Sequence, residues 1–230
     1  PAQPTVGRKV VNLTIEKVRF IESIIDSGRN KPLRGQACLA LSGVLASMGD
    51  SAEINKRRLD LIRKAIINAA DTKIGEVTVA DLAKEEIYRM TKLSKNATAP
   101  ELIGRDSQSQ PMKLSDFRGK VVVLVFWTSW EQSIEVLDYL RKIEQSYRGK
   151  RVQIVGVNRD SLSNLREIEM AQKSVGKNFS DPNGELYKVY RVTESPVCYV
   201  LDDKGVIQYN GQLGSFVDLT VSALLPASRK

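Results

Sequence analysis

The sequence predicts an α/β domain with a mixed central sheet and helices on both faces, preceded by a small all-α helical domain. Residues 8–95 carry apolar side chains at the three-four spacing of amphipathic helices. Residues 120–127 form an almost continuous, β-branched apolar run, which is typical of a strand buried on both faces. After this run, helical and strand patterns alternate and end in a hairpin signal, and that order favours a mixed sheet.

We assign the all-α domain to residues 1–95 and expect about four helices in it. The second helix is expected to end at Gly49, and the third to begin after Ser51. Thr78 and Asp81 resemble a capping arrangement at the start of the fourth helix. Short connections between such helices predict a bundle. We identify no family for this region.

The second domain is assigned to residues 96–230, because the polar stretch of residues 95–100, which ends in proline, is the best candidate for the boundary. The segment Asp202-Asp203-Lys204-Gly205 predicts a hairpin between its last two strands. The remaining elements follow from the apolar periodicity. Strands are expected at residues 120–127, 152–157, 197–201 and 205–210, and helices at residues 133–147, 162–175 and 216–225.

The positive charge of the chain, +8 in total, falls mostly in the first domain. Residues 1–98 hold 17 Lys and Arg against 11 Asp and Glu, while residues 99–230 hold 18 against 16. The cluster Lys56-Arg57-Arg58 with Arg63-Lys64 could contact an acidic partner, nucleic acid or anionic headgroups. Because acidic residues interrupt this cluster, we favour a solvated helix face and expect no nucleic-acid partner.

The chain contains no histidine and two cysteines, Cys38 and Cys198. Without histidine, a Ser-His-Asp triad, a Cys-His pair and a His-bearing zinc site are excluded within this chain, and we expect no metal and no cofactor. The cysteines form no CxxC pair, and their apolar neighbours favour buried structural thiols.

No apolar run approaches the roughly 20 residues that span a bilayer. The start, Pro-Ala-Gln-Pro, is typical of a processed or trimmed product.

Motifs of the second domain follow the order of one bacterial family. They are Ala99-Pro100-Glu101-Leu102, Leu114-Ser115-Asp116-Phe117-Arg118-Gly119-Lys120, Val125-Phe126-Trp127-Thr128-Ser129-Trp130, Ser195-Pro196 and Leu201-Asp202-Asp203-Lys204-Gly205. Over residues 99–226 the chain resembles the thiol-disulfide oxidoreductases of the TlpA and ResA type, within the redoxin group that includes the AhpC/TSA peroxiredoxins. The resemblance implies a thioredoxin-like fold for this domain.

The active-site turn of this family reads Phe-Trp-x-x-Trp-Cys-x-x-Cys, and its first cysteine lies at a helix N-terminus that stabilises the thiolate. The matching turn of this chain contains Trp127, Trp130, Glu131, Gln132, Ser133 and Ile134. Glu131 and Ile134 occupy the two cysteine positions, so the resemblance implies a degenerate site with no catalytic residue. A carboxylate suits a helix N-terminal cap, which is the role we favour for Glu131 over that of a general acid or base.

Two further departures from the family pattern point away from redox chemistry. Many thioredoxins place a buried carboxylate two residues before the tryptophan that matches Trp127, and this chain has Val125 there. A peroxiredoxin needs a peroxidatic cysteine near the same turn, but residues 121–140 contain no cysteine. We therefore expect neither the proton transfer of a thioredoxin nor peroxide reduction.

The family carries a cis-proline that faces the turn, and the residue before it pairs its backbone with an extended peptide. Pro196 and Ser195 match these two residues, and we predict a cis bond between them. Together with Trp127 and Trp130 they could form an apolar peptide-binding groove. The alternative is that Pro196 serves folding and packing alone. Cys198 is a possible redox thiol, although it lies inside the predicted strand.

Three functional hypotheses follow. The first is a redox-inactive module that binds a protein or peptide, and the second is a divergent thiol-disulfide oxidoreductase that uses Cys198, Cys38 or a cysteine of the partner. The third is a structural protein whose helices serve assembly. The missing CxxC pair favours the first and third. The resemblance also implies an exported bacterial protein that works outside the cytoplasm.

Overall fold

The computed structural model describes residues 5–27, 30–49, 51–129, 133–171 and 175–225. The chain divides into two compact units, Pro1–Met90 and Thr91–Lys230. This division falls inside a helix, whereas the sequence places the domain boundary after residue 95.

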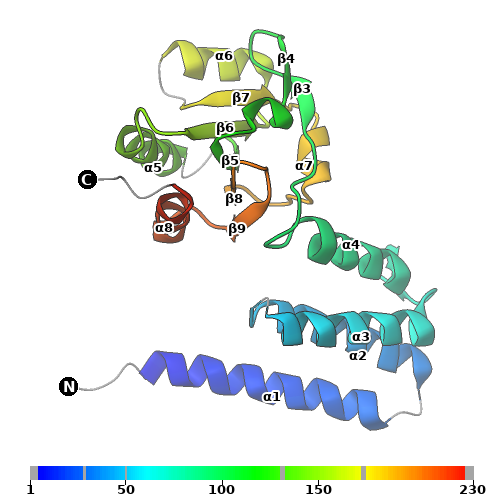
Figure 1. Ribbon diagram of the computed structural model, residues 1–230. Helices are drawn as coiled ribbons and strands as arrows, with labels where there is room; N and C mark the ends of the chain where they lie inside the picture. Colours follow the sequence, from blue (N-terminus) through cyan, green and yellow to red (C-terminus); the bar gives the residue numbers. More distant parts are fainter. Residues whose placement is uncertain (1–4, 28–29, 50, 130–132, 172–174, 226–230) are drawn as a thin grey trace. The chain divides into compact units, whose positions relative to one another are not determined.

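The first unit consists of helices with one small hairpin (Figure 1). Its elements are α1 (Thr5–Ser27), α2 (Lys31–Ala46), α3 (Ala52–Ala69), β1 (Lys73–Ile74), β2 (Val77–Thr78) and α4 (Val79–Lys92), the last of which continues past Met90. The Ser51 hydroxyl caps α3 by accepting from the Ile54 amide at 3.3 Å, and the Thr78 hydroxyl accepts from the Asp81 amide at 3.1 Å. Both helix starts are therefore as predicted, while the hairpin between α3 and α4 was not expected.

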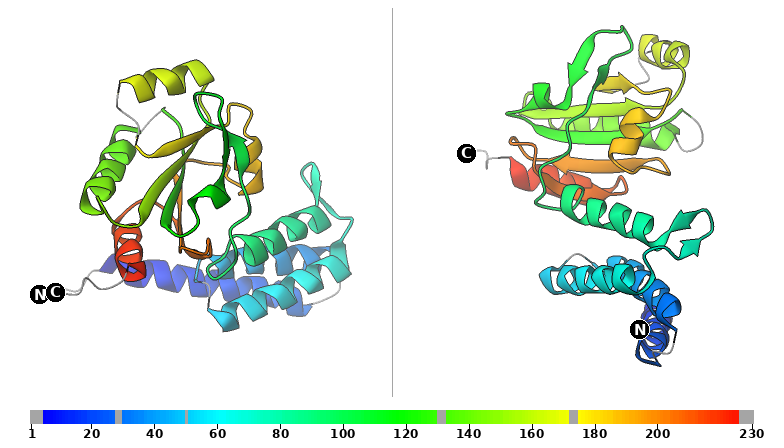
Figure 2. Two further views of the ribbon diagram at one scale, coloured as in Figure 1. Left: turned by 45° about the horizontal axis from the view of Figure 1, so that its top comes forward. Right: turned by 90° about the vertical axis from the view of Figure 1, so that its right-hand side faces the viewer.

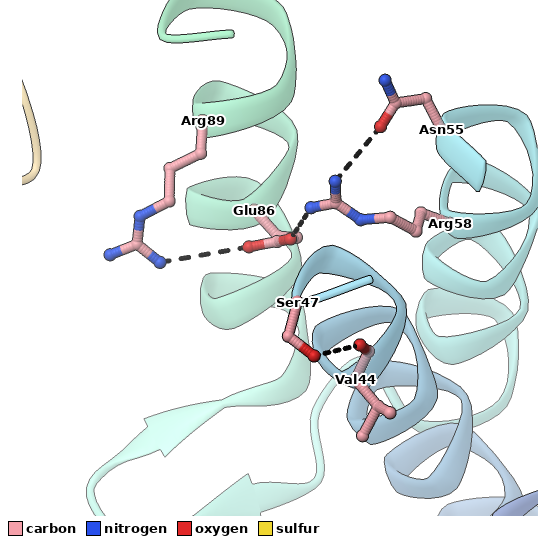
Figure 3. Close-up of polar contacts among 6 residues, drawn as sticks. All are labelled: Val44, Ser47, Asn55, Arg58, Glu86 and Arg89. Atoms are coloured by element: carbon pink, nitrogen blue, oxygen red, sulfur yellow. Dashed lines mark hydrogen bonds and ion pairs between the residues drawn. The ribbon is translucent and has the colours of Figure 1, made fainter. Parts of the chain in front are cut away.

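The basic cluster on α3 is only partly solvated, which corrects the interpretation of Arg58 as part of an exposed face. Arg58 is buried and pairs with Glu86 of α4, and its guanidinium also donates to the Asn55 side chain at 3.1 Å. Figure 3 shows these side chains pointing toward one another. Arg57 pairs with Glu22 of α1. A buried arginine needs a carboxylate partner, so this part of the cluster holds helices together.

The second unit is built on a five-stranded sheet of order β7-β6-β5-β8-β9. The central strand β5 pairs in parallel with β6 and antiparallel with β8, so the sheet is mixed, as predicted. The elements are β3 (Ile103–Arg105), β4 (Pro111–Lys113), η1 (Leu114–Phe117), β5 (Val121–Trp127), α5 (Ser133–Ser146), β6 (Val152–Asn158), α6 (Leu162–Met170), β7 (Lys177–Ser180), α7 (Glu185–Val189), β8 (Val197–Leu201), β9 (Ile207–Gly211) and α8 (Ser215–Leu224).

Helices cover both faces of this sheet, which confirms the predicted fold class. In the right-hand view of Figure 2, α7 lies in front of the sheet and α5 behind it. On one face, β5 packs in a single apolar cluster with residues of α5, α6 and α8. On the other face, the Phe126 ring contacts the Tyr187 and Tyr190 rings at centroid distances of 5.1 and 5.0 Å. All seven residues of β5 are buried, as expected for a central strand.

Several elements differ from the sequence prediction. The helix expected at residues 162–175 ends at Met170, where the Ala171 amide closes the last turn on the Glu167 carbonyl. The strands β3, β4 and β7 and the helix α7 were not predicted. Each has at most five residues, too few to show a clear apolar period.

Candidate functional site

The turn that follows β5 is described only in part. Thr128 and Ser129 are described, whereas the predictions for Trp130, Glu131 and Gln132 lie outside the described residues. Ser133 and Ile134 begin α5, but their side chains also lie outside the described set. The role of Glu131 as a helix cap therefore stays a prediction.

Trp127 supports the turn from within the domain and does not line a groove. Its side chain is 2% exposed, and its indole N–H donates to the Asn178 carbonyl oxygen at 3.2 Å. The Asn178 amide in turn donates to Glu169 at 3.0 Å. Because a buried indole N–H needs a partner, this chain of bonds holds the Trp127 ring in place. The expectation that Trp127 contributes an exposed groove surface was wrong.

A buried carboxylate, missed in the sequence, holds the chain where it enters the turn. Asp160 lies just after β6, is 5% exposed, and accepts from the Ser129 amide at 2.9 Å and from the Asn158 side chain at 3.0 Å. The Asn164 side chain donates to the Ser129 hydroxyl at 2.9 Å. The sequence signal that could have identified Asp160 is its position just past the carboxyl end of β6, the strand next to β5.

Pro196 lines a cleft at the same end of the sheet as the turn. The Ser195–Pro196 bond is cis, as predicted. The cleft measures about 490 Å³ and is lined by Glu135, Val136, Tyr139, Pro196, Gln212 and Leu213. It thus lies between α5, the proline segment and the loop from β9 to α8.

Two tyrosine hydroxyls join neighbouring segments at this end of the sheet by hydrogen bonds. Tyr139 donates to the Gly214 carbonyl at 2.6 Å, and burial with nearby Asp218 raises the pKa of Tyr139 to about 12. Tyr187 donates to the Trp127 carbonyl at 3.0 Å. Burial raises the pKa of Tyr187, although a hydrogen bond with the Ser195 side chain opposes this shift. Both phenols are therefore neutral donors at physiological pH, and Tyr187 joins the end of β5 to the proline segment.

The two cysteines are buried and free, in agreement with the expectation of structural thiols. Cys198 lies in β8 opposite Val125 and is fully buried, and this burial raises the pKa of its thiol. Cys38 lies on α2 and is 1% exposed, and burial also raises the pKa of its thiol, against the opposing effect of Lys64 and Arg34. Neither environment favours a thiolate.

We expect both thiols to be unreactive in the folded protein. At pH 8, modification by dithionitrobenzoate should be at least about 100-fold slower than in guanidinium, because raised pKa values deplete the thiolate and burial blocks the reagent. The Cys38→Ser and Cys198→Ser variants, followed by absorbance, assign each phase to one thiol. Fast labelling of either cysteine in the native protein would contradict this expectation.

Across the described ranges, no group of three or more Cys, Asp and Glu side chains is placed to hold a metal ion. Within the same ranges, none of the helices combines the length and the apolar character that a membrane crossing requires.

The second unit is similar to known proteins in sequence and in fold. The ResA thiol-disulfide oxidoreductase of Bacillus thuringiensis subsp. konkukian is 27% identical over 124 residues, which cover 50% of this chain and 68% of that protein. The ResA protein of Geobacillus kaustophilus is 26% identical over 161 residues, which cover 67% of this chain and 88% of that protein. The thioredoxin domain of a thiol-disulfide oxidoreductase from Bacteroides vulgatus superposes with a TM-score of 0.53 at 23% identity, covering 59% of this chain and 100% of that domain.

The sequence model of the AhpC/TSA family matches residues 96–210, half of the chain. This range holds the five-stranded sheet except the last residue of β9, and it includes the cleft residues up to Pro196. The chain therefore belongs to the AhpC/TSA family, and its second unit has the thioredoxin-like fold.

Proposed function

We propose that the thioredoxin-like domain, residues 96–230, is a redox-inactive module that binds an extended segment of a protein partner in the cleft beside Pro196. The observation that carries the proposal is the burial of both thiols, at 1% exposure for Cys38 and 0% for Cys198. Disulfide exchange needs a thiolate that can reach a disulfide sulfur. Neither thiol has that access, and the chain contains no other cysteine.

The cleft supplies the binding part of the proposal. Val136 and Leu213 give it apolar walls, while Glu135 and Gln212 are exposed at its rim. Its volume of about 490 Å³ suits one or two side chains of a peptide. In the family that this domain resembles, the residue before the cis-proline pairs its backbone with an extended peptide. Strand-like pairing along Ser195 would align the peptide past these walls. The resemblance also supports a location outside the cytoplasm.

The names of the relatives favour a second candidate, a divergent thiol-disulfide oxidoreductase. That activity would require a thiol of the partner, or an opening of the fold that exposes Cys198. If the partner supplies the thiol, the binding site is the same cleft. The two candidate functions then differ in whether disulfide exchange occurs, and not in where the partner binds.

Binding can be tested with a fluorescent, S-carboxymethylated insulin B chain, an extended peptide that cannot exchange disulfides. We expect saturable binding by anisotropy, and Leu213→Glu should weaken it by at least about ten-fold, because a carboxylate in the apolar wall must lose water when the peptide binds. Leu213→Ala, which adds no charge, should give a smaller loss in the same direction.

The control is Leu219→Glu on α8, which makes the same change at a leucine that is 62% exposed and does not line the cleft. This variant should bind as tightly as the wild type. Equal losses in both glutamate variants, or no saturation up to about 1 mM peptide, would exclude the proposed groove. Tryptophan fluorescence in urea verifies that each variant is folded.

A further inference from the structure

A second and larger cleft lies at the opposite end of the sheet from Pro196. It measures about 730 Å³ and is lined by Gly119, Val121, Gly149, Lys150, Arg151, Asp202, Asp203, Lys204, Leu224 and Leu225. Val121 begins β5, whose other end is Trp127, and Asp202 follows β8, which Pro196 precedes. The two clefts therefore share strands but no lining residue.

Backbone hydrogen bonds join the turns that form this cleft. The Val121 amide donates to the Arg151 carbonyl at 2.8 Å, and the Gly119 amide donates to the Asp203 carbonyl at 2.8 Å. The turn from β8 to β9 is closed by the Gly205 amide, which donates to the Asp202 carbonyl at 2.9 Å. Three segments that are distant in sequence are thus held in one arrangement, so the cleft is preformed.

Cations outnumber carboxylates around the cleft, whose lining holds three cations against the two carboxylates of Asp202 and Asp203. Lys150, Arg151 and Lys204 line it and are exposed, and Arg118 and Lys120 flank its Gly119. Within the described ranges none of these five cations forms an ion pair, while Lys150 lies 5.4 Å from the Tyr147 ring centroid and Lys120 donates to the Gln153 side chain at 3.4 Å. The carboxylate of Asp202 is occupied within the hairpin, where its oxygens accept from the Lys204 and Val206 amides and the Gln208 side chain at 2.9–3.0 Å.

The floor of the cleft is apolar, since Val121, Leu224 and Leu225 also line it. A concave site of this size with an apolar surface and a few convergent charges is typical of a site for a small organic molecule. We propose that this cleft binds a phosphorylated organic molecule, with the phosphate on the cations and an apolar portion against the leucines. Arginine and lysine are the usual phosphate-binding side chains. Cations that converge from three turns suit one compact, doubly charged group better than an extended acidic peptide.

Hexyl phosphate combines both features and is the probe for calorimetric titration of the full chain. We expect hexyl phosphate to bind. Inorganic phosphate, which lacks the apolar chain, and hexanol, which lacks the phosphate, should each bind at least about ten-fold more weakly. The Arg151→Glu/Lys204→Glu variant should weaken hexyl phosphate by at least about ten-fold. Should that variant fail to fold, Arg151→Gln/Lys204→Gln tests the same contacts with a smaller change in charge.

The matched control is Lys142→Glu/Lys177→Glu, which makes an equal change of charge at exposed lysines outside the cleft. Equal weakening in both double variants, or hexanol binding as tightly as hexyl phosphate, would overturn the proposal. Vesicles with and without phosphatidate identify the source of the phosphate. If the Arg151→Glu/Lys204→Glu variant no longer binds phosphatidate vesicles, the phosphate belongs to a lipid headgroup. If that variant still binds the vesicles and the protein does not bind hexyl phosphate, the cleft is not the binding site.

This proposal is independent of the peptide groove. Leu213→Glu should leave hexyl phosphate binding unchanged, and Arg151→Glu/Lys204→Glu should leave binding of the insulin B chain unchanged. Loss of one binding activity without the other therefore shows which of the two proposals fails.

Discussion

Insulin reduction by dithiothreitol should proceed no faster with the wild-type protein than with the reagent alone. The Glu131→Cys/Ile134→Cys variant, in contrast, should accelerate it by at least about ten-fold, because a thiolate before a helix start is stabilised by the helix dipole. The helix α5 begins at Ser133, two positions after residue 131. The measurement is the lag before insulin B chain precipitates, read as turbidity.

The control for this experiment is the Cys38→Ser/Cys198→Ser variant. Turnover by the wild type that disappears in this variant would show a concealed thiol mechanism, and the oxidoreductase candidate would replace the binding module. If the wild type reduces insulin only at the background rate and the Glu131→Cys/Ile134→Cys variant is faster, the proposal is supported. The fold would then retain the backbone geometry of the family's active site while lacking the cysteines for disulfide exchange. No gain in that variant would show that positions 131 and 134 do not match the cysteines of the family.

The Gly156→Ala substitution should lower the free energy of unfolding of the second unit by about 3 kcal/mol. A Cβ atom on Gly156 would lie 2.0 Å from the Asn178 carbonyl oxygen and 2.6 Å from the Trp127 indole nitrogen. These two atoms form the hydrogen bond that anchors Trp127, so the methyl group must separate them or move the strand. Both tryptophans, Trp127 and Trp130, belong to this unit, and their fluorescence in urea reports its unfolding.

Gly214→Ala is the matched control for this substitution. It lies in the same unit, just before α8, and a Cβ atom there would meet no atom within 4 Å. We expect a loss below about 1 kcal/mol, the cost of alanine at a helix cap. A similar loss in both variants would mean that Gly156 is not needed for the approach of Trp127 and Asn178.

Local patterns were sufficient for the main elements and for the family. The seven apolar residues of β5 require burial on both faces, which only a central strand provides. The capping residues Ser51 and Thr78 marked helix starts because their side chains satisfy amides within the next turn. Such signals act within a few residues, and the sequence alone can therefore reveal them.

The candidate site depended on contacts that no local pattern contains. Trp127 was expected at a groove surface, yet Asn178, 51 positions later, draws its indole into the interior. Asp160 reaches the Ser129 amide across neighbouring strands, and Arg58 finds Glu86 only when α3 and α4 pack together. Both clefts likewise combine segments that are distant in the sequence and meet at the two ends of the sheet.

The sequence by itself thus determined the order of the longer strands and helices, the resemblance to the family and the absence of cysteine from residues 121–140. Only the tertiary structure decided that Cys38 and Cys198 are buried and that Pro196 opens onto a cleft. The physical reason is that periodicity reports which face of one element is apolar. Burial of a thiol and the shape of a cleft depend on which other elements cover that face.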